Sequence, residues 1–352
     1  MCIIKPRNLK KNLLVTGSCG LVGSQISYDF SKKYRIIGID NNQRKNFFGH
    51  EGDTTQQKKN LLKIKNYKHY SVDIRNSKKI EKLVKKYKPI GIVHAAAQPS
   101  HDYAAKIVKE NFDININGTI NLLEAIRKFS KETIFVNFST NKVYGDLPNK
   151  LELSEKKLRY DFKDKKFLKG IDETFSVDQS LHSLFGASKI SSDIITQEYG
   201  RYFRVASCSL RAGCLTGENH SSVQLHGFLN YIIKIGALNK TYNIFGYKGK
   251  QVRDNIHSED VSSFVKEFLE NPKYGEVYNL GGGKQNSISI LESIKKIEQL
   301  TEKKFKFNYL NQPRIGDHIC YYSDLTKIHK HFPKWKITNS LDDIFYRIFK
   351  NL

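Results

Sequence analysis

The sequence predicts an α/β protein with a parallel sheet, doubly wound with helices on both faces, and a smaller C-terminal lobe. Three observations support this prediction. Short apolar segments alternate with helix-length segments through residues 13–211, as in folds built from repeated strand–helix units. A turn rich in glycine separates the first apolar segment from the first helix-length one. After Arg211 the alternation becomes a mixed pattern, which we interpret as the smaller lobe.

The alternation also places the individual elements of the large part. Six apolar segments are expected to be strands, at residues 13–16, 35–40, 69–73, 90–95, 134–139 and 205–211. Four segments between them are expected to be helices, at residues 21–32, 77–87, 104–129 and 183–199. Parallel strands that are joined by helices bring all their carboxyl ends to one edge of the sheet, and ligands bind at that edge.

These elements suggest how the chain is divided. We expect residues 1–211 to form the large domain, rejoined by about residues 251–270, and residues 212–352 to form the smaller lobe. Two charged inserts interrupt the large part. Residues 41–65 are expected to form a surface loop that leads into a short helix, whereas the insert at 150–175 is long enough to be a functional lid. Helices of the lobe are expected near 223–238, 258–269 and 287–300.

Composition argues against several other classes of protein. The 352 residues are 39% hydrophobic, which suits a folded core, and no run of about 18 apolar residues is available to span a membrane. The opening sequence MCIIKPRNLKK has no apolar segment ahead of a cleavage site, so we expect no signal peptide. The five cysteines form no Cys-x-x-Cys pair. Their scatter argues against a metal site or a disulfide framework and favours the reducing cytoplasm.

The net charge of +24 does not by itself indicate binding to nucleic acid. Most of the 59 basic residues are lysines spread as pairs along the chain, such as Lys32-Lys33, and no basic arm or platform of stacking aromatic residues is apparent. We interpret the charge as a lysine-rich, solvated surface that attracts anionic substrates. We therefore predict neither a specific nucleic-acid partner nor a membrane partner.

The segment LLVTGSCGLVG, from Leu13 to Gly23, has the layout of a dinucleotide-binding unit. Gly17 permits the tight turn, Gly20 lets the backbone approach a pyrophosphate, and Gly23 lets the following helix pack close to the strand. The N–H groups and the dipole of the helix amino end then face the phosphates. Asp40, at the tip of the second strand, can accept hydrogen bonds from an unmodified ribose and would repel a 2′-phosphate. We therefore predict NAD rather than NADP as the cofactor.

Residues at other strand ends complete the cofactor site of this Rossmann-type domain. Asp73 ends the third strand, where it can accept from an adenine amino group, and Ile74 can cover the ring. Small residues end the fourth strand and let the backbone run close to the cofactor. Asn115 lies inside the long helix and is either a tolerated polar residue or one that steadies the site's backbone. The remaining predicted cofactor contacts are Cys19, Leu21, Val22, Asn41, Ala95, Ala96 and Ala97.

Two further motifs show a resemblance that covers essentially the whole chain. FSTNKVYGD ends the fifth strand, and SLFGASK opens the helix at 183–199. With the loop TGSCGLVG and the later motifs KQVRD, YNLGGG and RIGD, they resemble the extended short-chain dehydrogenase/reductase family of nucleotide-sugar epimerases and dehydratases. Within this family, STNKVYGD and KQVRD are most similar to the 2-epimerases of CDP-dideoxyhexoses. The resemblance implies an NAD-dependent cytoplasmic isomerase that favours a CDP-sugar and dimerises through its two long helices.

The resemblance also implies catalytic roles. Thr140 falls on the Ser/Thr position that orients the reacting hydroxyl, and Lys189 falls on the lysine that binds the nicotinamide ribose and lowers the pKa of the neighbouring phenol. The tyrosine of the family's YxxxK pair falls on Phe185, which cannot carry a proton. Either His182, His101 or Thr140 acting through water replaces that phenol, or the site binds its ligands and turns over poorly.

Substrate contacts are implied as well. The related 4,6-dehydratases place Asp-Glu where this chain has Asn141-Lys142. Because elimination needs that acid–base pair, its loss favours epimerisation through a transient keto-sugar. Arg253 and Arg314 match positions that hold the nucleotide's diphosphate and ribose, although each could instead pair with a neighbouring aspartate. The predicted substrate contacts are Gln98, Thr140, Asn141, Arg253 and Arg314.

Two other functions remain open at this point. One is a different reaction on the same fold, such as 4-epimerisation, reduction or decarboxylation of a UDP- or GDP-sugar. The other is a weakly catalytic or non-catalytic protein that binds NAD and a nucleotide sugar, which the phenylalanine at position 185 favours.

Overall fold

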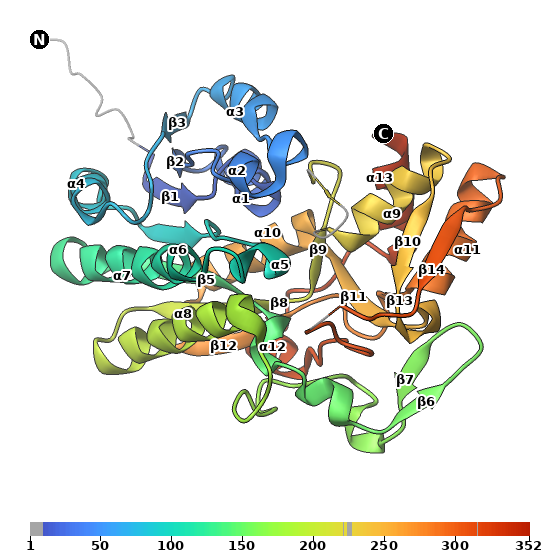
Figure 1. The fold of residues 1–352 in the computed structure, drawn as a ribbon. Helices are drawn as coiled ribbons and strands as arrows, with labels where there is room; N and C mark the ends of the chain where they lie inside the picture. The colour runs from blue at the N-terminus through green and yellow to red at the C-terminus, as the bar shows by residue number, and fades with distance from the viewer. Residues whose placement is uncertain (1–9, 221, 224–226, 315) are drawn as a thin grey trace, which may run out of the picture.

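A parallel sheet of seven strands forms the centre of the computed structural model, which describes residues 10–220, 222–223, 227–314 and 316–352 (Figure 1). Its strands are β1 (Asn12–Thr16), β2 (Arg35–Ile39), β3 (Tyr67–Tyr70), β4 (Gly91–His94), β5 (Ile134–Thr140), β8 (Ser207–Ala212) and β12 (Glu276–Leu280). The spatial order is β12-β8-β5-β4-β1-β2-β3, and every neighbouring pair is parallel. The chain order reverses between β1 and β4, which is where a doubly wound sheet binds its ligand. The predicted fold class is confirmed.

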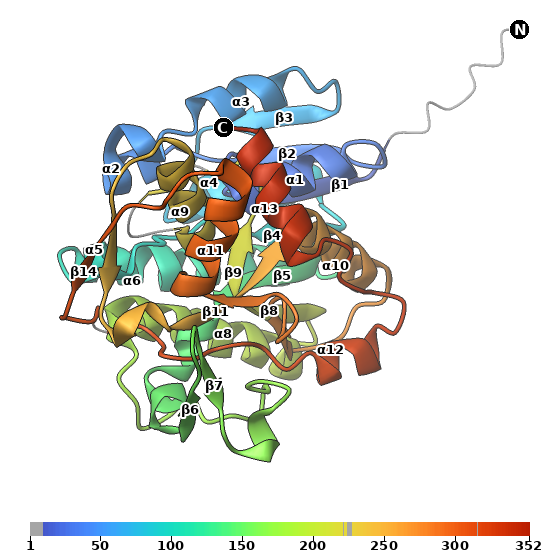
Figure 2. The same ribbon diagram turned by 90° about the vertical axis from the view of Figure 1, so that its right-hand side faces the viewer.

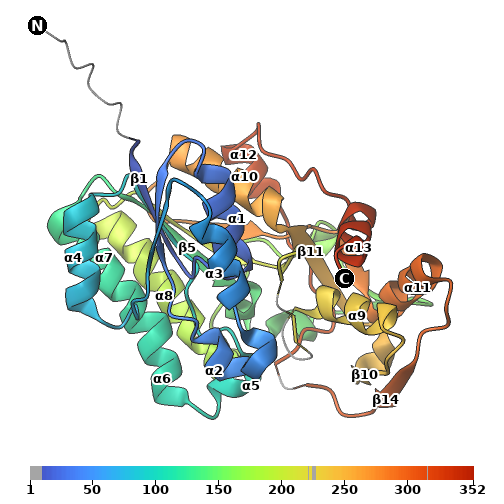
Figure 3. The ribbon, with the colours of Figure 1, turned by 90° about the horizontal axis from the view of Figure 1, so that it is seen from above.

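Helices cover both faces of this sheet, as Figure 3 shows. The helices on one face are α4 (Ser77–Tyr87), α7 (Gly118–Phe129) and α8 (Ser183–Tyr202). Those on the other face are α1 (Leu21–Phe30), α3 (Thr55–Leu62), α10 (Ser258–Glu270) and α12 (Thr326–His331). In β1, Leu13 and Val15 pack into the apolar cluster of the second face, whereas Leu14 packs into that of the first. Successive side chains of a strand point to opposite faces, so both faces of this strand are buried.

A smaller lobe lies beside the carboxyl ends of the strands and has its own apolar cluster (Figures 2 and 3). Its elements are α9 (Phe228–Ala237), β10 (Tyr242–Phe245), α11 (Ile290–Thr301), β14 (Phe307–Leu310) and α13 (Leu341–Lys350). A second sheet, of order β13-β11-β9, is formed by β9 (Cys214–Thr216), β11 (Val252–His257) and β13 (Ser287–Ser289). The chain returns to the large part with α10, whose apolar side chains join the cluster on the second face, and it re-enters the large sheet itself at β12. The division into two domains stays a prediction.

The structure differs from the expected elements in three stretches of the large part. The helix expected at 104–129 instead begins as α5 (His101–Ala104), followed by α6 (Val108–Phe112). A π-helical turn, Asp113–Asn117, then joins α6 to α7. The insert at 41–65 contains α2 (Arg44–Phe48) and a short 3-10 turn, Gly49–Gly52, before α3. The third strand ends at Tyr70, so Asp73 lies in the turn after it.

The insert at 150–175 is not a lid, and this expectation was wrong. It forms a hairpin of β6 (Leu153–Glu155) and β7 (Tyr160–Phe162), visible at the bottom of Figure 2. Phe162 is buried against the ring of Tyr322, with 5.1 Å between the ring centroids. None of residues 150–175 lines the main cavity of the described chain. The buried aromatic contacts therefore pack this segment against the rest of the protein, away from the cavity.

Two of the sequence predictions concern residues that the structure does not describe. The segment 1–9, for which no signal peptide was predicted, and residues 224–226 of the helix expected near 223–238 lie outside the described part of the chain. Across the residues that the structure does describe, no helix combines the length and the apolar character needed to cross a membrane.

Candidate active site

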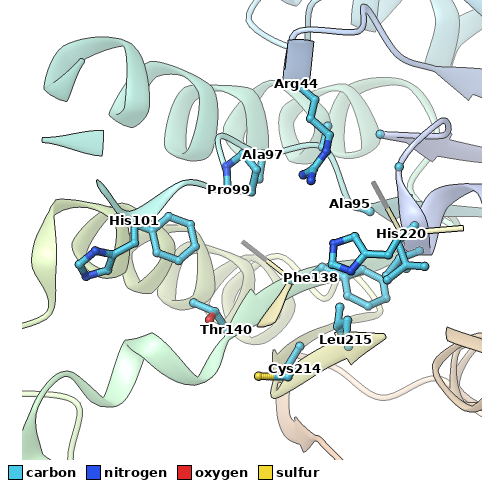
Figure 4. Close-up of a pocket in the computed structure, with 18 of the residues that line it drawn as sticks. Arg44, Ala95, Ala97, Pro99, His101, Phe138, Thr140, Cys214, Leu215 and His220 are labelled. Atoms are coloured by element: carbon cyan, nitrogen blue, oxygen red, sulfur yellow. The ribbon is translucent and has the colours of Figure 1, made fainter. Parts of the chain in front are cut away.

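A cavity of about 450 Å³ lies at the carboxyl ends of the large sheet and extends to the smaller lobe (Figure 4). Residues from the turns after β1, β2, β4, β5 and β8 form its wall on the sheet side. Side chains of α9, β10 and β11 close it on the lobe side. Figure 4 shows His101 and Thr140 on one side of this cavity and Arg44 and His220 on the other. The site therefore has two ends with different chemistry.

Gly17 and Gly23 of the glycine turn have no room for a side chain. Gly17 has φ of +65°, and a Cβ there would lie 2.7 Å from the Ala96 nitrogen. A Cβ on Gly23 would lie 2.1 Å from the Gly17 oxygen. Gly20 is the N-cap of α1 and contributes no side-chain cap, so the first N–H groups of that helix are left for a ligand. This cradle fits the pyrophosphate of a dinucleotide.

Asp40 holds the turn from the end of β2. Its Oδ2 accepts a hydrogen bond from the Cys19 N–H at 2.9 Å, and its Oδ1 accepts from the Asn42 N–H at 2.8 Å. Burial raises the pKa of the Cys19 thiol to about 12, and Asp40 adds to this effect, so the thiol stays neutral. The sequence reasoning missed Arg44 on α2, which also lines the wall. Burial lowers the pKa of Arg44 to about 10, but the group remains a cation at neutral pH.

Most residues that the sequence predicted for the site do line this cavity. They are Gly17, Cys19, Gly20, Leu21, Val22, Gly23, Asp40, Asn41, Asp73, Ile74, Ala95, Ala96, Ala97, Thr140, Asn141, Phe185, Lys189, Arg253 and Arg314. Asp73 is paired there with Arg75, Nη2 to Oδ2 at 2.7 Å. Their common location follows from the parallel sheet, which gathers the ends of distant strands.

Three predicted residues, Asn115, Gln98 and His182, are absent from the wall of this cavity. Asn115 is buried in the π turn and makes hydrogen bonds with the backbone of Gln98. It therefore steadies the wall rather than contacting the cofactor. Gln98 itself is fully buried, and its Nε2 donates to the Ser100 oxygen. His182 precedes α8, where its Nε2 lies 3.3 Å from the Ser180 hydroxyl.

Lys189 and Thr140 both line the cavity at the end of β5. The Lys189 Nζ donates to the Phe138 oxygen at 2.6 Å. Burial lowers the pKa of Lys189 to about 8, although the charge of Asp193 opposes this effect. Thr140 Oγ1 accepts from the Lys142 N–H at 3.3 Å. Phe185 lies on the same wall, so the position of the family's phenol faces the cavity without a hydroxyl.

A cluster of charges lies at the same end of the cavity. The Lys142 Nζ is 3.2 Å from Asp317 Oδ1, and the Arg253 Nη2 is 3.5 Å from Asp317 Oδ2. Arg314 pairs with Asp102 at 2.7 Å and with Asp317 at 3.8 Å. Burial alone would raise the pKa of Asp317, but the three cations hold it below its ordinary value. Arg253 and Arg314 thus line the cavity, as a substrate contact would, and are also paired with carboxylates, which the sequence left as the alternative.

Lys142, Asp317 and His220 were missed as wall residues. Lys142 and Asp317 stand inside the quoted motifs STNKVYGD and RIGD, so their position was a usable signal. His220 follows β9 in a segment without a recognisable pattern. Its location depends on how the lobe packs, which the sequence alone does not indicate.

The fold and the glycine cradle of the cavity are those of a dinucleotide-binding α/β protein. Residues 13–281 match the NAD dependent epimerase/dehydratase family. The chain belongs to this family, and its cofactor is NAD. A CDP-paratose 2-epimerase of Salmonella typhi is 33% identical over 325 residues, covering 90% of this chain and 92% of that protein. A UDP-glucuronate 4-epimerase of Thermodesulfobacterium geofontis is 27% identical over 323 residues, covering 90% of this chain and 88% of that one.

A solved structure shares the fold. It is a UDP-glucuronic acid 4-epimerase of Bacillus cereus, a tyrosine-to-phenylalanine mutant in complex with UDP-4-deoxy-4-fluoro-glucuronic acid and NAD. The two superpose with a TM-score of 0.79 at 24% identity, covering 97% of this chain and 98% of the other. The family match and the relatives in sequence, rather than this shared fold, make the protein a member of a family of nucleotide-sugar epimerases and dehydratases.

Proposed function

We propose that this protein is an NAD-dependent epimerase that inverts C2 of a CDP-dideoxyhexose such as CDP-paratose. The observation that carries the proposal is the chemistry of the wall beside Thr140. There the cavity presents Asn141 and Lys142, which cannot supply the paired carboxyl groups that eliminate water from a sugar. The resemblance of the whole chain to a CDP-paratose 2-epimerase supports the choice of base and carbon.

Lys189 and Thr140 would act on the sugar carbinol. Bound NAD supplies an acceptor and donor of hydride, so a carbinol can become a ketone and be reduced again from its other face. Thr140 would hold the reacting oxygen through its hydroxyl. The Lys189 Nζ, fixed by the Phe138 oxygen, would bind the nicotinamide ribose and place positive charge near the developing alkoxide. There is no net oxidation of the sugar.

Arg253 and Arg314 would bind the diphosphate of the nucleotide sugar. Both guanidinium groups line the cavity and are partly balanced by Asp317. A diphosphate can accept hydrogen bonds from two donors of one guanidinium group, which a lysine cannot supply in that geometry. We further propose a cytoplasmic homodimer that associates through α7 and α8.

A second candidate function is supported by Phe185. A protein that lacks the family's phenol binds NAD and a nucleotide sugar yet turns over slowly, if no other group carries the proton. This candidate and the first differ in rate and not in ligand.

The test is incubation of the NAD-loaded chain with CDP-paratose, UDP-glucuronate and dTDP-glucose, followed by NMR of the sugars. We expect a C2 epimer from the CDP-sugar alone. Deuterium placed at C2 should be retained in the product, because the hydrogen removed from C2 is returned to it. Turnover of a UDP-sugar without turnover of the CDP-sugar would show that the substrate is wrong. Binding of CDP-paratose without turnover would favour the second candidate.

A further inference from the structure

The phenylalanine at position 185 leaves the epimerase without its usual proton carrier. The wall residues near Thr140 therefore have to supply another group that ionises near neutral pH. Imidazole is the side chain whose ordinary pKa lies closest to that range. Two histidines of the described residues line the cavity, His101 and His220.

His220 is unsuited to this task. It lies on the side of the cavity away from Thr140, near Arg44 (Figure 4). Burial lowers its pKa to about 3, and the nearby charge of Arg44 contributes to the shift. Its Nδ1 already lies 3.4 Å from Asn230 Oδ1. A ring with so low a pKa is too weak a base to accept the sugar proton at neutral pH.

His101 lies on the same side as Thr140 (Figure 4). It begins α5, directly after the turn that follows β4. Its Nε2 is buried and has no hydrogen-bond partner among the residues that the structure describes. This nitrogen faces Gly316, where a Cβ would come within 2.5 Å of it. The Gly316 oxygen also accepts from the Lys142 Nζ at 2.9 Å, so Gly316 contacts both the His101 ring and the side chain of Lys142.

Asp102 is placed to orient the ring. Its Oδ1 lies 3.6 Å from the His101 Nδ1, and its Oδ2 accepts from Arg314 at 2.7 Å. Contact with His101 and the charge of Arg314 lower the pKa of Asp102, so its carboxylate remains ionised. A carboxylate behind an imidazole fixes the ring and stabilises the imidazolium that forms when the ring accepts a proton.

We propose that His101, oriented by Asp102, is the proton carrier that replaces the missing phenol, an inference that rests on the proposed epimerase function. In the first half-reaction the sugar O–H bond breaks and its proton goes to the imidazole. The electron pair of that bond forms the C=O bond while the C–H pair leaves as hydride to NAD⁺. In the second half-reaction the hydride returns to the opposite face and the imidazolium returns the proton to oxygen. Asp102 is a positioning residue in this scheme.

The test compares four forms of the full-length chain loaded with NAD: wild type, His101→Gln, His101→Gln with Phe185→Tyr, and His182→Gln. Glutamine keeps a polar side chain but neither accepts nor releases a proton near neutral pH. We expect His101→Gln to lower kcat for CDP-paratose about 100-fold. Its calorimetric affinity for CDP-paratose should change by less than about threefold. His182→Gln is the matched control, since that histidine is outside the cavity, and should retain the wild-type kcat.

The double variant separates proton transfer from structure. Because a phenol at position 185 would stand at the family's own position, we expect it to restore at least about tenfold of the lost rate. Wild-type kcat in His101→Gln would overturn the inference, and so would a loss that Phe185→Tyr fails to restore. If the wild type binds CDP-paratose but epimerises no nucleotide sugar, the proposed function has failed. An active wild type with an active His101→Gln means that only the role of His101 has failed.

Discussion

The side-chain amide of Asn115 is hydrogen-bonded to both backbone groups of Gln98. Its Oδ1 accepts from the Gln98 N–H at 2.9 Å, and its Nδ2 donates to the Gln98 oxygen at 3.2 Å. The same Nδ2 lies 2.9 Å from the Ser188 hydroxyl of α8. Asn115 thus joins the turn after β4 to α8, and these two segments carry His101 and Lys189. The π turn that contains Asn115 brings its amide to this position.

We expect Asn115→Ala to lower the free energy of unfolding by about 2–3 kcal/mol, because it leaves the buried backbone groups of Gln98 unpaired. Urea unfolding followed by circular dichroism measures this change. Asn117→Ala is the matched control. That side chain is exposed in the same turn and donates to Asp113, so its loss should cost less than about 0.5 kcal/mol. Equal effects of the two substitutions would show that Asn115 does not hold the wall.

The fold was predictable because the signals were local. Strands such as β1, β2 and β4 are short apolar segments that end in a turn, whereas β12 lies outside the six predicted strands. The insert at 150–175 was misread for the opposite reason. Its polar sequence predicts a solvated loop, but Phe162 and Tyr160 pack against a cluster that includes Tyr321 and Tyr322. A contact between residues so distant in the sequence has no local signal.

Site residues could be predicted where they stand at or directly after the end of a strand, because the parallel sheet places those positions on the cavity wall. Gly17, Asp40 and Thr140 are such residues, and they line the cavity. Gln98 lies off the wall because Asn115 binds its backbone and its side chain turns to the Ser100 oxygen, contacts that have no local signal in the sequence. His182 and His101 are equally plausible from sequence. Only the fold shows that one borders the cavity and the other contacts Ser180 instead.

Gly20→Ala should separate cofactor binding from folding. A Cβ on Gly20 would meet only the Gly17 oxygen, at 3.4 Å, which is an ordinary contact. We therefore expect stability to change by less than about 1 kcal/mol. NAD affinity should fall at least about tenfold, because the methyl group would occupy the space through which the backbone approaches the pyrophosphate. Thermal unfolding and calorimetric titration with NAD measure the two effects.

Gly23→Ala provides the comparison in the same turn. Its Cβ would lie 2.1 Å from the Gly17 oxygen, so the backbone of the turn has to move. We expect this variant to lose stability as well as NAD affinity. If Gly20→Ala bound NAD like the wild type, the pyrophosphate would have to lie elsewhere.

The proposed dimer predicts a role for exposed apolar residues of α8. Ile194 is 46% exposed and Tyr202 is 78% exposed on this helix. We expect Ile194→Glu to convert the dimer to a monomer, because a buried carboxylate without a partner opposes association. Light scattering after size exclusion measures the mass. Leu310→Glu on β14, where the side chain is 41% exposed, is the control and should leave the mass unchanged. A wild-type monomer would contradict the proposed dimer directly.

Lys189 should make stability depend on pH in a definite direction. Burial lowers its pKa from the usual 10.5 to about 8 in the folded chain. Below pH 8 the folded and the unfolded chains both bind this proton, and the folded chain bears the full cost of burying the charge. Between pH 8 and 10.5 the unfolded chain binds more protons, so stability rises with pH. Relative to Lys189→Met, which does not titrate, the free energy of unfolding of the wild type should rise by up to about 3 kcal/mol over this range.

Urea unfolding of both chains at about pH 7 and about pH 10 measures this rise. Lys266→Met, on the exposed side of α10, is the control. A difference between wild type and Lys189→Met that is the same at both pH values would mean that the lysine is solvated rather than buried at the end of β5.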